Sequence, residues 1–271
     1  MVRMRNERAT MTEHVRSADG TRIAYDRAGT GPTVILVAGA MQFRGFDPET
    51  VAMGRALADR GFTVINYDRR GRGESADAGS FSLARELDDI AALIAAGGGT
   101  AALFGSSSGS AICLAAAAAG LPITRLALWE APLGEENGTD SEENLAGLRE
   151  RLAAGDGDAT IEYFMKDMPR EWLEGAKRSP GWPIMVSMGP SLQDDTEALA
   201  WTQSAPRDAL WARITQPVLA IVGEQTLPIM ESAVASITAA LPSAQAVTIA
   251  GSNHSWDPQA LVEALARFLA E

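Results

Sequence analysis

Apolar residues along the chain follow two patterns that alternate from about residue 33 onward. Short apolar runs of strand length occupy 33–37, 62–66, 101–104, 125–129, 217–222 and 245–249. Longer segments with helical patterns occupy 81–96, 107–119, 229–241 and 258–269. Another helix is predicted to begin at Asp47-Pro48, because aspartate is a good helix cap and proline suits the first helical position. The alternation predicts an α/β protein with a doubly wound, mostly parallel sheet.

The start of the chain follows a different pattern. Residues 13–17 and 21–28 flank Asp19-Gly20, a strong turn dipeptide, and indicate a hairpin that gives the sheet a two-stranded antiparallel start. We expect residues 1–11 to form an N-terminal tail. The core of the fold is then predicted to comprise residues 12–132 and 214–271.

Residues 133–213 interrupt the alternation with a polar, helix-rich segment that lacks a convincing buried strand. Four of the six tryptophans of the chain lie in it: Trp172, Trp182, Trp201 and Trp211. An aromatic-rich insertion between two strands suggests a helical lid over a mostly apolar cleft. For any single tryptophan, packing of the lid onto the body is the alternative role.

Charge and composition exclude several classes of partner. The 271 residues include 23 Lys and Arg against 35 Asp and Glu, a formal net charge of −12, which argues against a nucleic acid or an anionic membrane as partner. The only cysteine, Cys113, lies in an apolar helix and is expected to be a core residue. Because no signal-peptide pattern and no apolar run of membrane-spanning length occur, we expect a cytoplasmic protein. The pattern gives no oligomeric state.

Gly105-Ser106-Ser107-Ser108-Gly109 carries the chemistry of the chain. It fits Gly-x-Ser-x-Gly between a predicted strand and a predicted helix, a context in which the central serine occupies a sharp turn with its hydroxyl exposed. Serine needs a base, and the chain has only two histidines. His14 lies at the edge of the first hairpin. His254 follows the last predicted strand, at the sheet edge where Ser107 is expected, and is the predicted base.

An oxyanion formed at Ser107 would need backbone N–H donors held in place. The N–H of Ser108 is one donor by the geometry of the turn. The second is expected from the loop Ala38-Gly39-Ala40-Met41 after the strand 33–37, with Ala40 as first choice and Met41 as second. An ordinary glycine turn is the alternative interpretation of this loop.

These motifs, taken in order, resemble the α/β-hydrolase superfamily over about residues 12–271. Asp68 to Ser75 is similar to that family's Asp-x-Arg-Gly-x-Gly-x-Ser loop, which is structural there. The family usually has His-Gly where this chain has Ala38-Gly39, and usually has a residue larger than Ser106 before its nucleophile. It also places its acid after the penultimate strand, where this chain has Thr226.

Two carboxylates could replace the missing acid. Glu130 follows the strand 125–129, and the resemblance implies that some relatives place their acid there. Glu224 lies two residues before Thr226 and is the alternative, whereas Asp257-Pro258 is better explained as a helix cap. We favour a triad of Ser107, His254 and Glu130; the remaining alternative is a site without an acid.

The resemblance implies a serine hydrolase of small, fairly apolar esters or related acyl compounds that needs no metal and no cofactor. We expect Met41, Trp129, Trp182 and Trp201 to line the substrate pocket. Two alternatives remain open: a non-hydrolytic enzyme of this fold, such as a C–C lyase, a cyclase or a cofactor-free oxidase, and a ligand-binding relative with a degraded triad. Epoxide hydrolases and haloalkane dehalogenases of this fold are disfavoured, because they use aspartate in place of Ser107.

Overall fold

A single sheet organises the molecule, for which a computed structural model describes residues 12–75 and 80–271. The predicted tail, residues 1–11, lies outside the described residues. Within the described chain the sheet has nine strands in the order β1-β2-β4-β3-β5-β6-β7-β8-β9. The strands are β1 Glu13–Arg16, β2 Arg22–Ala28, β3 Thr33–Val37, β4 Thr63–Tyr67, β5 Ala101–Ser106, β6 Ile123–Trp129, β7 Val218–Gln225, β8 Ala244–Ser252 and β9 Ser255–Trp256. Strands β3 to β8 are parallel, and β1, β2 and β9 are antiparallel to their neighbours.

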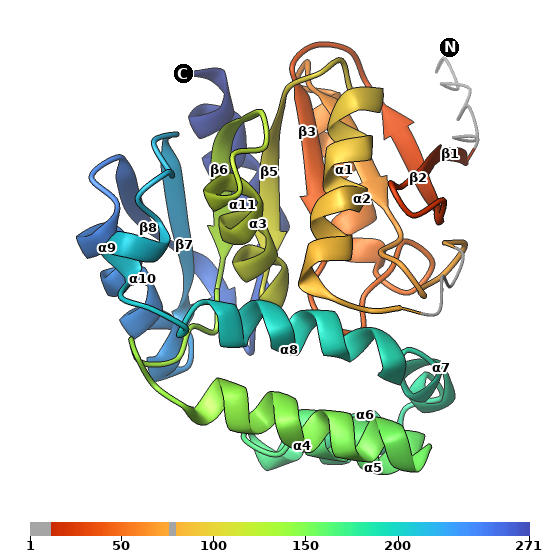
Figure 1. Cartoon of the computed structure of the whole chain (residues 1–271). Coiled ribbons are helices and arrows are strands. Elements are labelled where there is room, and N and C mark those ends of the chain that lie inside the picture. The colour runs from red at the N-terminus through yellow and green to blue at the C-terminus, as the bar shows by residue number, and fades with distance from the viewer. Residues whose placement is uncertain (1–11, 76–79) are drawn as a thin grey trace.

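Helices cover both faces of the sheet, which confirms the predicted doubly wound fold (Figure 1). One face is covered by α2 (Leu83–Ala96), α3 (Ser108–Ala118) and α10 (Pro228–Ala240). The other face is covered by α1 (Pro48–Ala58) and α11 (Pro258–Ala270). Asp47 caps α1 as predicted, since its side chain accepts a hydrogen bond from the N–H of Thr50. Asp257 caps α11 in the same way through the N–H of Ala260.

The end of the chain differs from the prediction in one place. The apolar pattern predicts that the last strand ends at residue 249, but β8 continues to Ser252 and pairs with the short antiparallel strand β9. The turn between these strands therefore has only two residues, Asn253 and His254. Both have positive φ, 53° and 65°, as a type I′ turn requires. Apolar periodicity gave no signal for β9, because a two-residue strand is too short to show one.

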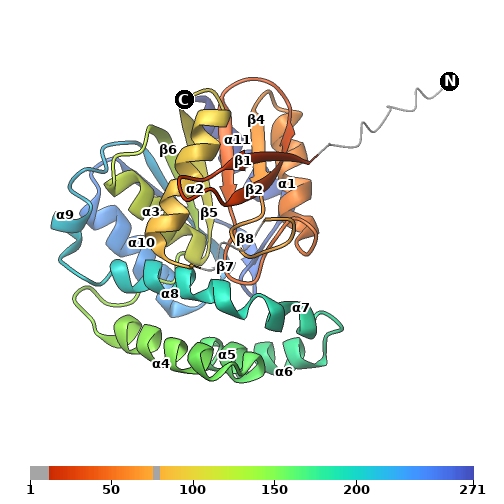
Figure 2. The same ribbon diagram turned by 45° about the vertical axis from the view of Figure 1, so that its right-hand side comes forward.

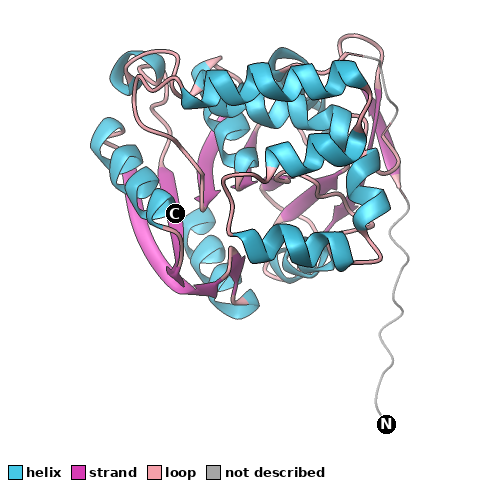
Figure 3. Ribbon diagram, turned by 90° about the horizontal axis from the view of Figure 1, so that it is seen from below, coloured by secondary structure: helices cyan, strands magenta, loops and turns pink. Residues whose placement is uncertain are grey.

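The segment between β6 and β7 forms a helical layer at the carboxyl ends of the parallel strands. It contains α4 (Asp140–Ala154), α5 (Gly157–Phe164), α6 (Arg170–Arg178), α7 (Trp182–Ser187), the 3₁₀ helix η1 (Gly189–Ser191), α8 (Leu192–Trp201) and α9 (Arg207–Leu210). Helix α8 lies next to the sheet and contacts α3 and α2, whereas α4 and α5 lie farther away (Figures 1 and 2). Seen from below, these helices lie in front of the sheet (Figure 3). Across the described residues, every helix is too short or too polar to cross a membrane.

Glycines allow the nucleophile turn to pack closely against its neighbours. A Cβ at Gly109 would lie 2.3 Å from the carbonyl oxygen of Val37, and one at Gly105 would lie 2.6 Å from the Cα of Ser110. Both distances are far below van der Waals contact. Without side chains at these two positions, helix α3 can lie this close to β5 at Gly105 and to the end of β3 at Gly109.

We expect Gly109→Ala to destabilise the fold strongly, because the added methyl group would have to displace the backbone of β3. Overpacking of this kind typically costs about 1–3 kcal/mol, and a clash with backbone belongs at the upper end. Gly175→Ala in α6 is the matched control, since a Cβ there would meet no atom within 4 Å and alanine favours the helix. Thermal unfolding followed by circular dichroism should show a lower Tm for Gly109→Ala only. Equal Tm values for both variants would contradict this account.

Candidate active site

Ser107 occupies the strained turn between β5 and α3. Its φ of 54° and ψ of −127° lie in a backbone region that residues other than glycine rarely adopt. Its N–H donates to the carbonyl of Trp129 at 2.9 Å, which ties the turn to the end of β6. Strain of this kind costs of order 1–3 kcal/mol and persists only where the surroundings enforce it. Here it holds the Ser107 side chain at the wall of a pocket.

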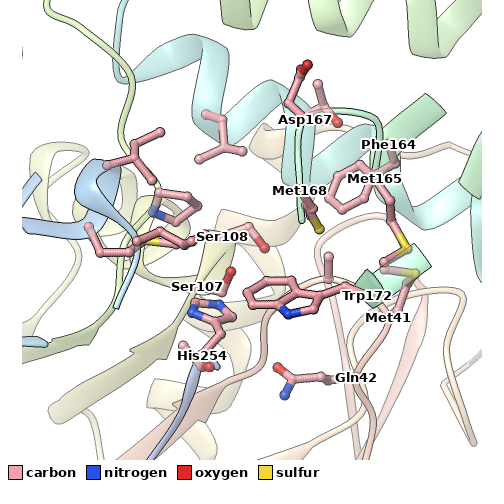
Figure 4. A pocket seen from close by; sticks show the side chains of 18 of the residues that line it. Met41, Gln42, Ser107, Ser108, Phe164, Met165, Asp167, Met168, Trp172 and His254 are labelled. Carbon is pink, nitrogen blue, oxygen red and sulfur yellow. The ribbon is translucent and has the colours of Figure 1, made fainter. Parts of the chain in front are cut away.

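His254 reaches the same pocket from the two-residue turn between β8 and β9. Figure 4 shows its ring beside Ser107. The indole N–H of Trp129 donates to the carbonyl oxygen of His254 at 3.5 Å, which supports the turn from below. A tight hairpin fixes the backbone more firmly than an open loop would, so the position of the imidazole depends on few free torsions.

Glu130 is the carboxylate that contacts His254. Its Oε2 lies 2.5 Å from the Nδ1 of His254, and its Oε1 accepts a 3.0 Å hydrogen bond from the N–H of Gly223. The side chain is only 2% exposed. Burial raises the pKa of Glu130, but the hydrogen bonds from His254 and Gly223, together with the nearby Thr226 hydroxyl, lower it more, so the net pKa lies below its usual value. The carboxylate is therefore charged at neutral pH.

The alternative carboxylate, Glu224, lies elsewhere. It occupies a register shift between Gly223 and Gln225, where β7 pairs irregularly with β8, and its side chain is exposed to solvent. Of the two carboxylates that the sequence offered, the structure thus brings only Glu130 to His254. Gly223 makes this contact possible, because a Cβ there would lie 3.0 Å from Oε1 of Glu130.

Positive φ values are concentrated at this site. Six non-glycine residues of the described chain have them: Met41, Ser107, Glu130, Asn137, Asn253 and His254. Only Asn137 lies away from the pocket and from the residues that contact it. Strained backbone collects where function requires a fixed geometry, so this distribution is evidence for a functional site that does not depend on the motif.

The two segments expected to supply oxyanion donors each carry a backbone N–H without a hydrogen-bond partner among the described residues. The hydrogen bonds between described residues use neither the N–H of Ala40 nor that of Ser108, whereas the N–H of Gly39 is taken up by Oε1 of Gln42 at 2.8 Å. Ala40 and Ser108 both line the pocket. A Cβ at Gly39 would lie 3.0 Å from the Cβ of Ser107, so this loop approaches the serine as closely as glycine permits.

The pocket has a volume of about 410 Å³ and a mostly apolar wall. Methionine and aromatic side chains dominate the part formed by the insertion, including Phe164, Met165, Met168 and Trp172 (Figure 4). Three carboxylates also line it, those of Asp47, Glu49 and Asp167, and no lysine or arginine does so among the described residues. Among residues 12–75 and 80–271, no three His, Cys, Asp or Glu side chains are grouped as a metal site requires.

Only one of the four side chains expected in the pocket lines it, namely Met41. Trp129 is buried below the site, edge to face with Trp256 at 5.5 Å. Trp182 packs within the insertion and donates to Asp158 at 2.6 Å, and Trp201 packs on the main core. These three expectations are corrected by the structure. Strand and helix positions alone do not say which way a large side chain points.

Trp172 is the tryptophan that reaches the site. Its ring lies 6.1 Å from the ring of His254, centroid to centroid, with an angle of 23° between the planes. The residue lies in the first turn of the amphipathic helix α6, whose orientation over the pocket depends on how the insertion packs. Its aromatic character was the only signal in the sequence, and three other tryptophans of the insertion shared it.

Sequence comparison identifies the family. Residues 34–264 match the alpha/beta hydrolase family, and the chain belongs to it. No curated protein sequence matches the chain.

Three solved structures with the same fold are a hydrolase of this family, a second hydrolase and an esterase. An alpha/beta hydrolase from Sphaerobacter thermophilus DSM 20745 is 34% identical, with a TM-score of 0.82 over 95% of this chain and 100% of that one. A hydrolase from Pseudomonas aeruginosa PA01 is 25% identical, with a TM-score of 0.73 over 97% and 100%. A thermophilic esterase from Thermogutta terrifontis is 22% identical, with a TM-score of 0.70 over 96% and 98%, a likeness that concerns the fold alone.

Proposed function

We propose that this protein is a serine hydrolase that cleaves small, fairly apolar esters or related acyl compounds through an acyl-enzyme. The observation that carries the proposal is the 2.5 Å contact between Glu130 and His254 in the pocket that also holds Ser107. A nucleophile, a base and a group that orients the base are the three parts that covalent acyl transfer needs. The largely apolar pocket wall supports a substrate with an apolar acyl or alcohol part.

The proposed reaction begins with attack of the Ser107 hydroxyl oxygen on the ester carbonyl, while Nε2 of His254 takes the hydroxyl proton. Because Nδ1 faces Glu130, it carries the other ring proton, which leaves Nε2 free to accept. The charged carboxylate then stabilises the imidazolium. The tetrahedral oxyanion accepts hydrogen bonds from the N–H groups of Ala40 and Ser108.

Collapse of this intermediate breaks the bond to the alcohol, which leaves with the proton from His254. Water then attacks the acyl-serine, with His254 again acting as base, and Ser107 is restored with release of the acid. Every proton passes through His254, so the two half-reactions need no further titratable group.

A fluorophosphonate probe tests whether Ser107 is activated. We expect stoichiometric labelling, located at Ser107 by peptide mass spectrometry, because only an activated serine attacks such phosphorus centres quickly. Heat-denatured protein is the control and should not react. If the native protein is not labelled, it is a binding protein with a degraded triad. If it is labelled but turns over no ester, a non-hydrolytic reaction of the same fold is indicated.

The charge of the pocket predicts a preference for neutral substrates. Asp47, Glu49 and Asp167 repel an anionic acyl group, and no cation among the lining residues offsets them. We expect kcat/KM for p-nitrophenyl butyrate to exceed that for p-nitrophenyl hemisuccinate at least tenfold, roughly 1.4 kcal/mol, after correction for their rates of alkaline hydrolysis. The ratio should shrink at high salt, which screens the repulsion. Equal values for the two esters would contradict the prediction.

A further inference from the structure

A fully buried group of charged side chains lies between the nucleophile turn and the helical insertion. It includes Arg69 and Arg72, from the loop after β4, and Asp195 from helix α8, all three 0% exposed. Arg69 also pairs through Nε with the buried Glu86 of α2 at 2.9 Å. Asp195 accepts from Nη1 of Arg69 at 2.6 Å and from Nη2 of Arg72 at 2.5 Å. Helix α8 is thereby joined to the body of the molecule through ion pairs and not only through apolar contact.

The same group contacts both segments that carry the proposed oxyanion donors. The hydroxyl of Ser108 donates to Oδ1 of Asp195 at 2.6 Å. Nη1 of Arg72 donates to the carbonyls of Gly39 at 2.6 Å and Gln42 at 3.3 Å, on either side of Ala40 and Met41. Nη1 of Arg69 donates to the carbonyl of Ala38 at 3.2 Å. One carboxylate and two guanidinium groups therefore fix the backbone on both sides of the oxyanion position.

Stability alone is a weak explanation for this arrangement. Removing charges from water costs several kcal/mol per ion, and a buried ion pair often stabilises no more than apolar residues of the same size. What the pairs supply is fixed geometry: the Arg72 fork and both Asp195 oxygens accept only a narrow range of positions. Oxyanion stabilisation depends on donors that are already in place.

We propose that Asp195 and Arg72 are positioning residues that align the Ala40 and Ser108 N–H groups, so that helix α8 of the insertion forms part of the catalytic machinery. This inference rests on the proposed function. It assigns α8 a role that differs from that of α6, which covers the pocket and contributes Trp172. Movement of α8 away from the body would therefore loosen the oxyanion donors, whereas movement of α6 alone would not.

Asp195→Asn provides the first test, because asparagine keeps the shape but loses the charge and one acceptor. We expect kcat for p-nitrophenyl butyrate to fall about 100-fold, with KM within about threefold, since the donors act on the transition state more than on bound substrate. Asp89→Asn is the matched control. Asp89 of α2 is also 0% exposed and accepts from both Nε and Nη2 of Arg70, an arginine of the same loop, but this pair joins the loop to α2 and not to α8. The Asp89→Asn substitution should lower Tm without a change in kcat.

Ser108→Ala provides a second test if Asp195→Asn fails to fold. It removes one hydroxyl and keeps the backbone N–H, so kcat should fall about tenfold with KM unchanged. Wild-type kcat in Ser108→Ala, and in Asp195→Asn where it folds, would overturn the positioning role, provided that Ser107→Ala is inactive. Equal losses in Asp195→Asn and Asp89→Asn would also overturn it, because they would indicate a general effect of instability. If the wild-type protein hydrolyses no ester, the proposed function fails and the positioning role with it.

Discussion

Ser107→Ala is expected to abolish turnover of a short p-nitrophenyl ester, with kcat lowered on the order of 10⁴-fold to 10⁶-fold. Alanine removes the only atom that can form the acyl-enzyme and leaves the turn, the base and the oxyanion donors in place. The residual rate would come from those donors and from binding alone. Initial rates of nitrophenolate release, measured at saturating ester, give the comparison directly.

A neighbouring serine makes the test specific. Ser110→Ala is the control for loss of a nearby hydroxyl, because that hydroxyl is buried and donates to the carbonyl of Gly105 at 2.9 Å, away from the pocket. It should retain wild-type kcat within about threefold. Activity of Ser107→Ala within a few-fold of wild type would show that another group is the nucleophile. Mass spectrometry after rapid acid quench should detect an acyl adduct on wild type and on Ser110→Ala, but not on Ser107→Ala.

The fold and the nucleophile turn could be predicted from the sequence because local rules determine both. Apolar runs of two lengths specify strands and helices, and the strands of the parallel sheet occupy the predicted positions to within a few residues. Gly105 and Gly109 mark the close approach of α3 to β5 and to the end of β3, and the sharp turn that this packing requires gives Ser107 its strained φ. Each of these signals lies within a dozen residues of the feature it predicts.

The sequence alone limited the choice of the triad acid to two carboxylates, Glu130 and Glu224. Glu130 and His254 are separated by 124 positions, and their contact depends on how β6, β7 and β8 align in the sheet. The register shift at Glu224 exposes that side chain, and no sequence pattern reveals such a shift. Gly223 is a residue of the sequence that indicates Glu130 as the acid, since its missing side chain provides the space that the Glu130 carboxylate occupies.

The pocket was the least predictable part. Its wall comes from several insertion helices, whose packing depends on contacts between α4, α5 and α8 and on the buried pairs of Arg69 and Arg72 with Asp195. Tryptophan is large enough to pack inward or line a cavity equally well, and only Trp172 reached His254. Tertiary packing, and not local propensity, decided the direction of each ring.

Glu130→Gln is expected to lower kcat/KM by about 10²-fold to 10⁴-fold, whereas Glu224→Gln should stay within about twofold of wild type. Glutamine fits the same space but brings an amide that can donate to Nδ1 of His254, which favours the wrong tautomer and removes the charge that stabilises the imidazolium. Glu224 is exposed and separate from the ring, so the same substitution there should not affect catalysis. Steady-state kinetics on one neutral ester compares all three proteins.

The pH dependence of stability separates the charge of Glu130 from its shape. Because the folded pKa of Glu130 is below its unfolded value, its carboxylate adds stability above the unfolded pKa, and that stability is lost as pH falls through the folded pKa. Wild type should therefore unfold at a higher Tm than Glu130→Gln at pH 7, and the difference should narrow toward pH 3.

The kinetic comparison of the two glutamine variants decides which carboxylate is the acid. If Glu130→Gln keeps wild-type kcat/KM while Glu224→Gln loses at least tenfold, Glu224 is the acid. If both variants retain full activity, His254 works without a carboxylate.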